Sequence, residues 1–88
     1  MNIALDYDGT FTTDPHFWLG FIYSARAAGH VVHIVTMRYE SEPITAFTGN
    51  CLTWYTGRKA KKAWCEKEGL EFDIWIDDRP EWLCADSA

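Results

Sequence analysis

The stretch Asn2-Ile3-Ala4-Leu5-Asp6-Tyr7-Asp8-Gly9-Thr10 decides how the rest of the chain is interpreted. It starts with a short apolar run, which is typical of a strand buried in a sheet. The run ends at Asp6, and polar and turn-forming residues follow it. Gly9 allows the tight backbone path that a loop at a strand end needs. The stretch therefore predicts a buried strand with two carboxylates just beyond its carboxyl end.

Strand-like and helix-like patterns alternate along the rest of the chain. A helix is expected after Asp14, a typical N-cap residue followed by Pro15, and it should stop at Gly29. Further strands are expected at 31–35, 51–56 and 72–76, and further helices at 42–47, 59–68 and 79–84. Strands separated by helices imply a parallel sheet with right-handed crossovers. The expected fold is α/β, a small Rossmann-like three-layer sandwich with about four parallel strands, forming one domain over residues 1–88.

Composition narrows the classes of function. The 88 residues carry a net charge of −5, so the basic footprint of a general nucleic-acid binder is absent, although the run 58–62 is locally basic. The apolar runs are too short to cross a membrane. There are three cysteines without a C-x-x-C pair and no signal peptide, so we expect reduced thiols in a cytoplasmic protein.

Polar residues follow the predicted strands where each strand ends. Asp6 and Asp8 follow the first strand, Thr36 ends the second, and Asp77 and Asp78 follow the fourth. Parallel strands all end at one edge of their sheet, which is also where ligands bind in such folds. Four carboxylates placed close together repel one another unless they share a cation or a proton. Oxygen-only ligands of this kind favour Mg²⁺ together with the oxygens of a substrate phosphate.

The spacing of these residues indicates roles for them. Asp6 can face the ligand as a nucleophile that forms an aspartyl-phosphate, and Asp8 can turn in behind it as a proton donor. A hydroxyl from Thr36 and an ammonium from a lysine could then hold the phosphoryl oxygens, because stabilising that charge is most of the catalytic task.

The chain resembles the haloacid dehalogenase (HAD) superfamily in four motifs that span residues 6–78. Asp6-Tyr7-Asp8-Gly9-Thr10 is similar to its D-x-D-G-T motif, and the apolar strand that ends at Thr36 is similar to its second motif. A lysine at the head of the helix before the fourth strand resembles the third motif, and Ile76-Asp77-Asp78 resembles the fourth.

The resemblance implies a catalytic role for each matching residue. Asp6 would be the phosphorylated nucleophile and a Mg²⁺ ligand, and Asp8 the general acid and base, offering its backbone carbonyl to the metal. Thr36 would bind a phosphoryl oxygen, and Asp77 and Asp78 would complete the metal site. For the lysine, Lys59, Lys61 and Lys62 compete. We favour Lys61, which shares a helical face with Trp64 three residues later, and place Lys59 second. Arg38 is expected near the substrate.

The chain departs from larger members of the superfamily, because the segments after Thr10 and Thr36 are too short to contain a cap domain. An open site suits a protruding phosphorylated substrate, and nucleotides or nucleic-acid ends are our preferred candidates. The expected function is that of a Mg²⁺-dependent phosphatase. The alternatives are a non-catalytic module that binds metal or phosphate, and a phosphoacceptor domain of the response-receiver kind, whose acceptor aspartate would lie on a middle strand.

Overall fold

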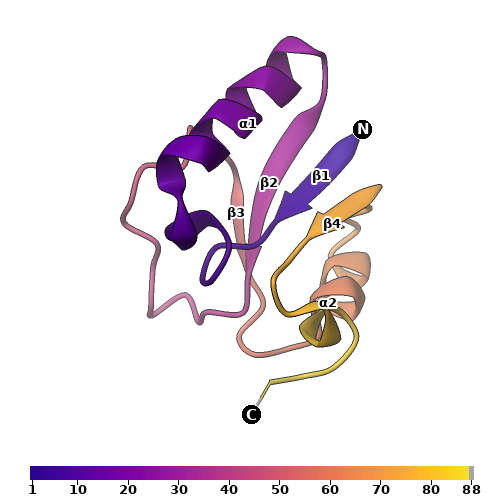
Figure 1. The fold of residues 1–88 in the computed structure, drawn as a ribbon. Helices are drawn as coiled ribbons and strands as arrows, with labels where there is room; N and C mark the ends of the chain where they lie inside the picture. The colour runs from indigo at the N-terminus through magenta and orange to yellow at the C-terminus, as the bar shows by residue number, and fades with distance from the viewer. Residues whose placement is uncertain (88) are drawn as a thin grey trace.

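Four short parallel strands form the centre of the molecule, and the computed structural model describes residues 1–87 (Figure 1). The strands are β1 (Asn2–Leu5), β2 (Val31–Thr36), β3 (Thr53–Tyr55) and β4 (Ile74–Ile76). The α-helices are α1 (Pro15–Ala27) and α2 (Lys61–Lys67), and two short 3₁₀ helices are η1 (Phe11–Thr13) and η2 (Pro80–Leu83). The predicted α/β class and the four-stranded parallel sheet are therefore confirmed.

The connections between the strands cross the sheet first in one direction and then in the other. The order is β3-β2-β1-β4, and every neighbouring pair is parallel. The chain moves from β1 outward to β2 and β3, and then returns to place β4 on the other side of β1. At the centre of the sheet Leu5 of β1 is aligned with Ile34 of β2 and Ile76 of β4. The point where the direction changes thus lies between β1 and β4, and in open α/β sheets ligands bind beyond the strand ends at such a point.

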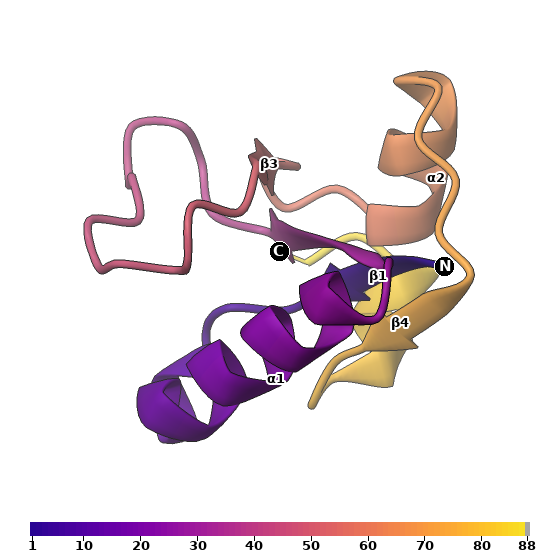
Figure 2. The same ribbon diagram turned by 90° about the horizontal axis from the view of Figure 1, so that it is seen from above.

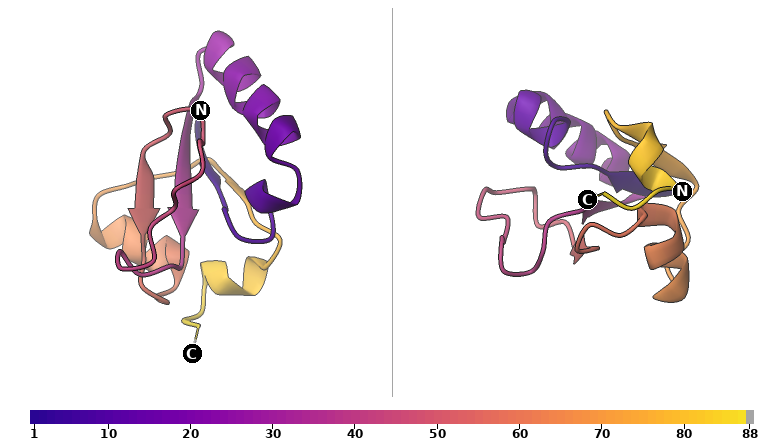
Figure 3. Two further views of the ribbon diagram at one scale, coloured as in Figure 1. Left: turned by 90° about the vertical axis from the view of Figure 1, so that its left-hand side faces the viewer. Right: turned by 90° about the horizontal axis from the view of Figure 1, so that it is seen from below.

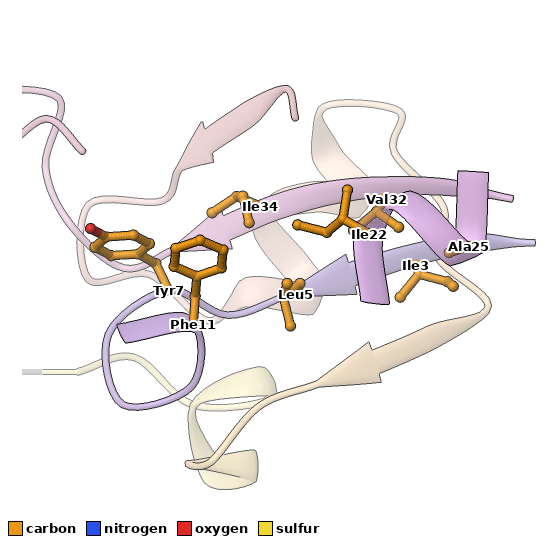
Figure 4. Packing of buried hydrophobic residues seen from close by; sticks show 8 residues of the cluster. All are labelled: Ile3, Leu5, Tyr7, Phe11, Ile22, Ala25, Val32 and Ile34. Carbon is orange, nitrogen blue, oxygen red and sulfur yellow. The ribbon is translucent and has the colours of Figure 1, made fainter. Parts of the chain in front are cut away.

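The α1 helix covers one face of the sheet. The Asp14 carboxylate accepts a hydrogen bond from the backbone N–H of Phe17 at 3.2 Å, and Pro15 occupies the first helical position. Both features stabilise a helix start. Buried residues of α1 and of the adjacent face of β1 and β2 form one cluster with two rings from the loop after β1 (Figure 4). Its members are Ile3, Leu5, Tyr7, Phe11, Ile22, Ala25, Val32 and Ile34.

The α2 helix packs on the opposite face. Ala4, Val35 and Cys65 form a second buried cluster there, against partly buried Trp54 and Trp75 among other side chains. Figures 2 and 3 show the sheet between the two helices. Because side chains alternate along a strand, Ile34 and Val35 of β2 belong to different clusters. None of the helices in the described part of the chain is long and apolar enough to span a membrane.

The prediction of a helix at 42–47 is wrong. Residues 37–52 form an irregular connection between β2 and β3, which Figure 2 shows projecting from the sheet. Its backbone is held by side chains instead of helical bonds: the Tyr55 hydroxyl accepts from Ile44 N–H at 3.0 Å, and the carbonyls of Glu42 and Pro43 accept from Arg38. A backbone bonded in this way to the rest of the fold does not need helical hydrogen bonds.

Four other elements are shorter than predicted. The third strand covers Thr53–Tyr55 of the predicted 51–56, and the fourth covers Ile74–Ile76 of 72–76. Each is an edge strand that is paired on one side only, over three residues of its single neighbour. The helix predicted at 59–68 starts at Lys61, and the final helix is a 3₁₀ helix at Pro80–Leu83.

Candidate functional site

Three aspartates meet where β1 and β4 end. Asp6 directly follows β1, and Asp77 and Asp78 directly follow β4. The backbone N–H of Asp6 donates to the carbonyl of Ile76 at 2.9 Å, which continues the β1–β4 ladder into the site. One carboxylate oxygen from each aspartate lies within 4.8 Å of the others. The topology therefore brings residues 71 positions apart into one cluster.

Lys61, at the first position of α2, supplies the positive charge. Its Nζ lies 2.6 Å from Asp6 Oδ1 and 2.5 Å from Asp77 Oδ2, and its side chain is 2% exposed. The side chain of Lys59, the second candidate, is 67% exposed, and its Nζ lies 3.9 Å from Asp86 Oδ2. The structure thus places Lys61 in the site and Lys59 on the surface.

Thr10 connects Asp6 to Asp78. Its hydroxyl lies 3.0 Å from Asp6 Oδ2 and 3.2 Å from Asp78 Oδ1, and it accepts from the backbone N–H of Asp78 at 3.2 Å. Sequence reasoning quoted Thr10 in its motif without giving it a role. The available signal was its place directly after Asp-Gly, in a loop that must fold back over the strand end.

Gly9 lets Asp78 approach this loop closely. Its φ is +83°, and a Cβ at this position would lie 2.4 Å from Asp78 Oδ2. The backbone conformation therefore favours glycine here, and a larger residue would displace the Asp78 carboxylate.

Burial dominates the electrostatics of Asp6. It raises the pKa of the Asp6 carboxyl from 3.8 to about 7, because an ionised carboxylate is costly to hold away from water. The Lys61 ammonium acts in the opposite direction and lowers this pKa, whereas the neighbouring Asp78 and Asp77 raise it. Near neutral pH Asp6 is therefore poised between its protonated and ionised forms.

Asp8 and Arg38 form a separate pair. The Arg38 Nε and Nη2 atoms each lie 2.8 Å from one carboxylate oxygen of Asp8. This two-pronged hydrogen bond lowers the pKa of Asp8 below its usual range. The Asp8 carboxylate does not belong to the cluster of Asp6, Asp77 and Asp78. It lies at the same strand end, two residues after Asp6.

Thr36 is buried at the end of β2, and its hydroxyl oxygen accepts from the backbone N–H of Arg38 at 3.2 Å. Among the hydrogen bonds within residues 1–87, none joins its side chain to the three aspartates. The structure therefore gathers Asp6, Lys61, Asp77 and Asp78 in one cluster, in which Lys61 contacts Asp6 and Asp77, and leaves Thr36 and Asp8 bonded to Arg38.

The donor set fits a divalent cation that prefers oxygen ligands. Both carboxylate oxygens of Asp77 are engaged, one by Lys61 and the other by the backbone N–H of Arg79 at 2.9 Å. Asp6 Oδ2 and Asp78 Oδ1 each lie near one hydrogen-bond donor, the Thr10 hydroxyl, so both oxygens retain acceptor capacity. Mg²⁺ needs one or two carboxylates and takes its remaining ligands from water or substrate. Of the three aspartates, Asp6 and Asp78 are therefore the ones with oxygens available to a divalent cation.

Comparisons with known proteins add no assignment: no family model, curated protein or solved structure matches the chain.

Proposed function

We propose that this chain is a Mg²⁺-dependent phosphohydrolase of the capless HAD type, acting through an aspartyl-phosphate on Asp6. The observation that carries the proposal is the convergence of Asp6, Lys61, Asp77 and Asp78 at the point where strand order reverses. Because α1 covers one face of the sheet and α2 covers the other, we assign the fold to the Rossmann-like three-layer sandwiches. The free thiols of Cys51, Cys65 and Cys84 suit the reducing cytoplasm where we place the protein.

The reaction has two chemical steps. In the first, a carboxylate oxygen of Asp6 attacks phosphorus and the bond from phosphorus to the ester oxygen breaks. Asp8, once released from Arg38 and protonated from solvent, gives that oxygen its proton. In the second, Asp8 takes a proton from water as the water oxygen attacks phosphorus, and the bond to Asp6 breaks to release inorganic phosphate.

Lys61 and Thr36 are the residues we assign to the phosphoryl group. The Lys61 ammonium is buried beside Asp6, so its charge acts on an incoming phosphate with little screening by solvent. The bound cation, held by Asp6 and Asp78 with the backbone carbonyl of Asp8, would supply charge neutralisation for the phosphate oxygens. The substrates we favour remain nucleotides or nucleic-acid ends, because within residues 1–87 no inserted domain covers the strand ends.

The experiment measures hydrolysis of p-nitrophenyl phosphate with Mg²⁺ and with EDTA. We expect Mg²⁺-dependent turnover that falls at least about a thousandfold in Asp6→Asn, because a nucleophile cannot be replaced by its amide. Glu71→Gln is the matched control, since it makes the same acid-to-amide change at an exposed position. Folding of both variants is checked by circular dichroism.

Turnover that survives in Asp6→Asn would exclude the aspartyl-phosphate. Absence of turnover together with tight binding of Mg²⁺ or phosphate would favour the alternative, a binding module without catalysis. The observation on the side of that alternative is the pairing of Asp8 with Arg38, which leaves the proposed acid engaged.

A further inference from the structure

Arg38 fastens the connection after β2 to the loop after β1. Besides its two bonds to Asp8, its Nη1 donates to the carbonyls of Glu42 and Pro43 at 3.3 and 3.4 Å. Its guanidinium lies over the Tyr7 ring, 5.1 Å from the ring centre. The guanidinium is thus held with its fork of N–H donors directed at the carboxylate of Asp8, two residues after the proposed nucleophile.

The pair of Arg38 and Asp8 is open to exchange. The side chain of Asp8 is 55% exposed and that of Arg38 is 30% exposed, so solvent and solutes reach both. Solvent screens the charges of an ion pair this exposed. The same planar fork of N–H donors fits a phosphate or another carboxylate as well as it fits Asp8. An anion from a ligand can therefore take the place of Asp8 at little cost.

We propose that Arg38 determines substrate specificity by binding a second acidic group on the leaving-group side of a phosphate monoester, in exchange for Asp8. The inference rests on the proposed phosphatase function and names its substrate class. The substrate carries a carboxylate or a second phosphate close to the ester oxygen. Binding of that group separates Arg38 from Asp8 and leaves the Asp8 oxygens free to face the leaving group.

The positions of the two cations assign the second acidic group to this side. Lys61 lies between Asp6 and Asp77, where the transferred phosphoryl group binds in the proposed reaction. Arg38 contacts Asp8, which faces the leaving oxygen in that reaction. An anion on Arg38 therefore belongs to the part of the substrate that departs. A substrate without such an anion leaves Asp8 paired and reacts slowly.

The experiment compares matched substrates that differ in one acidic group. Glycerol 3-phosphate and 3-phosphoglycerate share a three-carbon skeleton and test a carboxylate, and propane-1,3-diol phosphate and its bisphosphate test a second phosphate. We measure kcat and KM from released phosphate for the unaltered protein, Arg38→Gln, Arg38→Lys and the control Lys67→Gln. Lys67 is exposed in the last turn of α2, so its loss changes net charge without touching the site.

We expect the unaltered protein and Lys67→Gln to prefer the substrate with two acidic groups in at least one pair by about tenfold or more, the scale of one charge-assisted hydrogen bond. The preference should vanish in Arg38→Gln and be mostly lost in Arg38→Lys, whose single ammonium keeps the charge but not the fork. The first pair alone responding identifies a carboxylate, and the second alone a phosphate. An undiminished preference in Arg38→Gln, or none in the unaltered protein, would overturn the inference.

A binding measurement separates this inference from the proposed function. In Asp6→Asn, calorimetry should show tighter binding of the substrate with two acidic groups, and Asp6→Asn/Arg38→Gln should lose that difference. If no substrate is hydrolysed but this difference is found, the phosphatase proposal fails and the anion site at Arg38 stands. If substrates are hydrolysed and bound without any such difference, the inference about Arg38 fails alone. Should Arg38→Gln unfold, Arg38→Lys decides the same comparisons.

Discussion

Lys61 is a buried ammonium held between two buried carboxylates, Asp6 and Asp77. Such a group is costly to remove from water and is retained only because both partners satisfy it. Deleting the ammonium leaves two carboxyl groups facing each other at low exposure, so that either one must take up a proton or the two must repel each other, and both outcomes oppose folding. Its role in the site and its role in stability therefore share the same contacts.

The first prediction concerns Lys61→Met at pH 8 without added metal. We expect the free energy of unfolding in urea to fall by about 3–5 kcal/mol, the usual cost of breaking a buried pair. Lys59→Met, on an exposed side chain two residues earlier, should change it by no more than about 0.5 kcal/mol. Equal losses in the two variants would show that the buried ion pairs do not stabilise the fold.

The second prediction follows from the Asp6 pKa. Its pKa in the folded protein is about 7, above the 3.8 of an unperturbed carboxyl. Between these values the folded state binds more protons than the unfolded state, so the contribution of Asp6 to the free energy of unfolding falls as pH rises from 5 to 7. Subtracting the pH profile of Asp6→Asn from that of the unaltered, metal-free protein should reveal this decline. The subtraction also removes the contribution of His33, whose pKa burial lowers.

Metal binding gives an independent readout of the same proton. Mg²⁺ must displace this proton. We therefore expect the apparent Kd for Mg²⁺ to decrease by up to about tenfold for each unit that pH rises toward 7, and to level off above pH 7. Calorimetry at pH 6, 7 and 8 measures this dependence. An affinity that does not change with pH would contradict a protonated Asp6 in the metal-free protein.

The residues of the site differ in how well the sequence predicts which side chains they contact. Asp6, Asp77 and Asp78 follow directly on strands, so the sheet alone places them together, and Lys61 faces them from the first position of α2. Asp8 lies two residues after Asp6, within the loop that follows β1, and its half-exposed side chain pairs with Arg38. That choice depends on the path of the connection after β2, and no sequence pattern specifies it.

At the scale of elements, the turn after β1 offers a test with an internal control. Gly9 and Gly69 both have positive φ, at +83° and +77°, but only Gly9 would bring a Cβ against Asp78. We expect Gly9→Ala and Gly69→Ala each to lose about 1 kcal/mol of stability from the unfavourable backbone conformation. Only Gly9→Ala should also lose most of its Mg²⁺ affinity, because Asp78 must move away. Equal affinities in the two variants would separate Asp78 from the metal site.

The regular elements were easier to predict than the connections. The α1 helix has an aspartate cap, a proline start and a glycine end, and these local signals suffice to define it. The segment 42–47 has Pro43 as a comparable start but too few periodic residues to decide its conformation. Its backbone bonds to Arg38 and Tyr55, and these partners are brought to it by the fold. Tertiary contacts thus override the local preference there.

At the scale of the whole molecule, the two clusters share one thin sheet. Ile34 belongs to the cluster under α1 and Val35 to the cluster under α2, and both are buried neighbours on β2. A substitution that disturbs β2 on one face is therefore expected to weaken the packing on the other face as well. The site lies at the end of this sheet, and its geometry depends on both helices because Lys61 comes from α2 and the Thr10 loop leads into α1.

The last prediction tests whether the two faces unfold together. Ile34→Ala should lower the free energy of unfolding by about 2–5 kcal/mol, and Val35→Ala by about 2 kcal/mol, through lost burial and the cavity left behind. Val31→Ala, at an exposed position of the same strand, should cost far less. In each variant, tryptophan fluorescence and far-ultraviolet circular dichroism should report one coincident transition in urea. Trp18 packs against the cluster under α1, and the cluster under α2 is packed against by Trp54, Trp64 and Trp75. Separate transitions for the fluorescence and circular dichroism signals would mean that the clusters fold independently and that the site is assembled from two units.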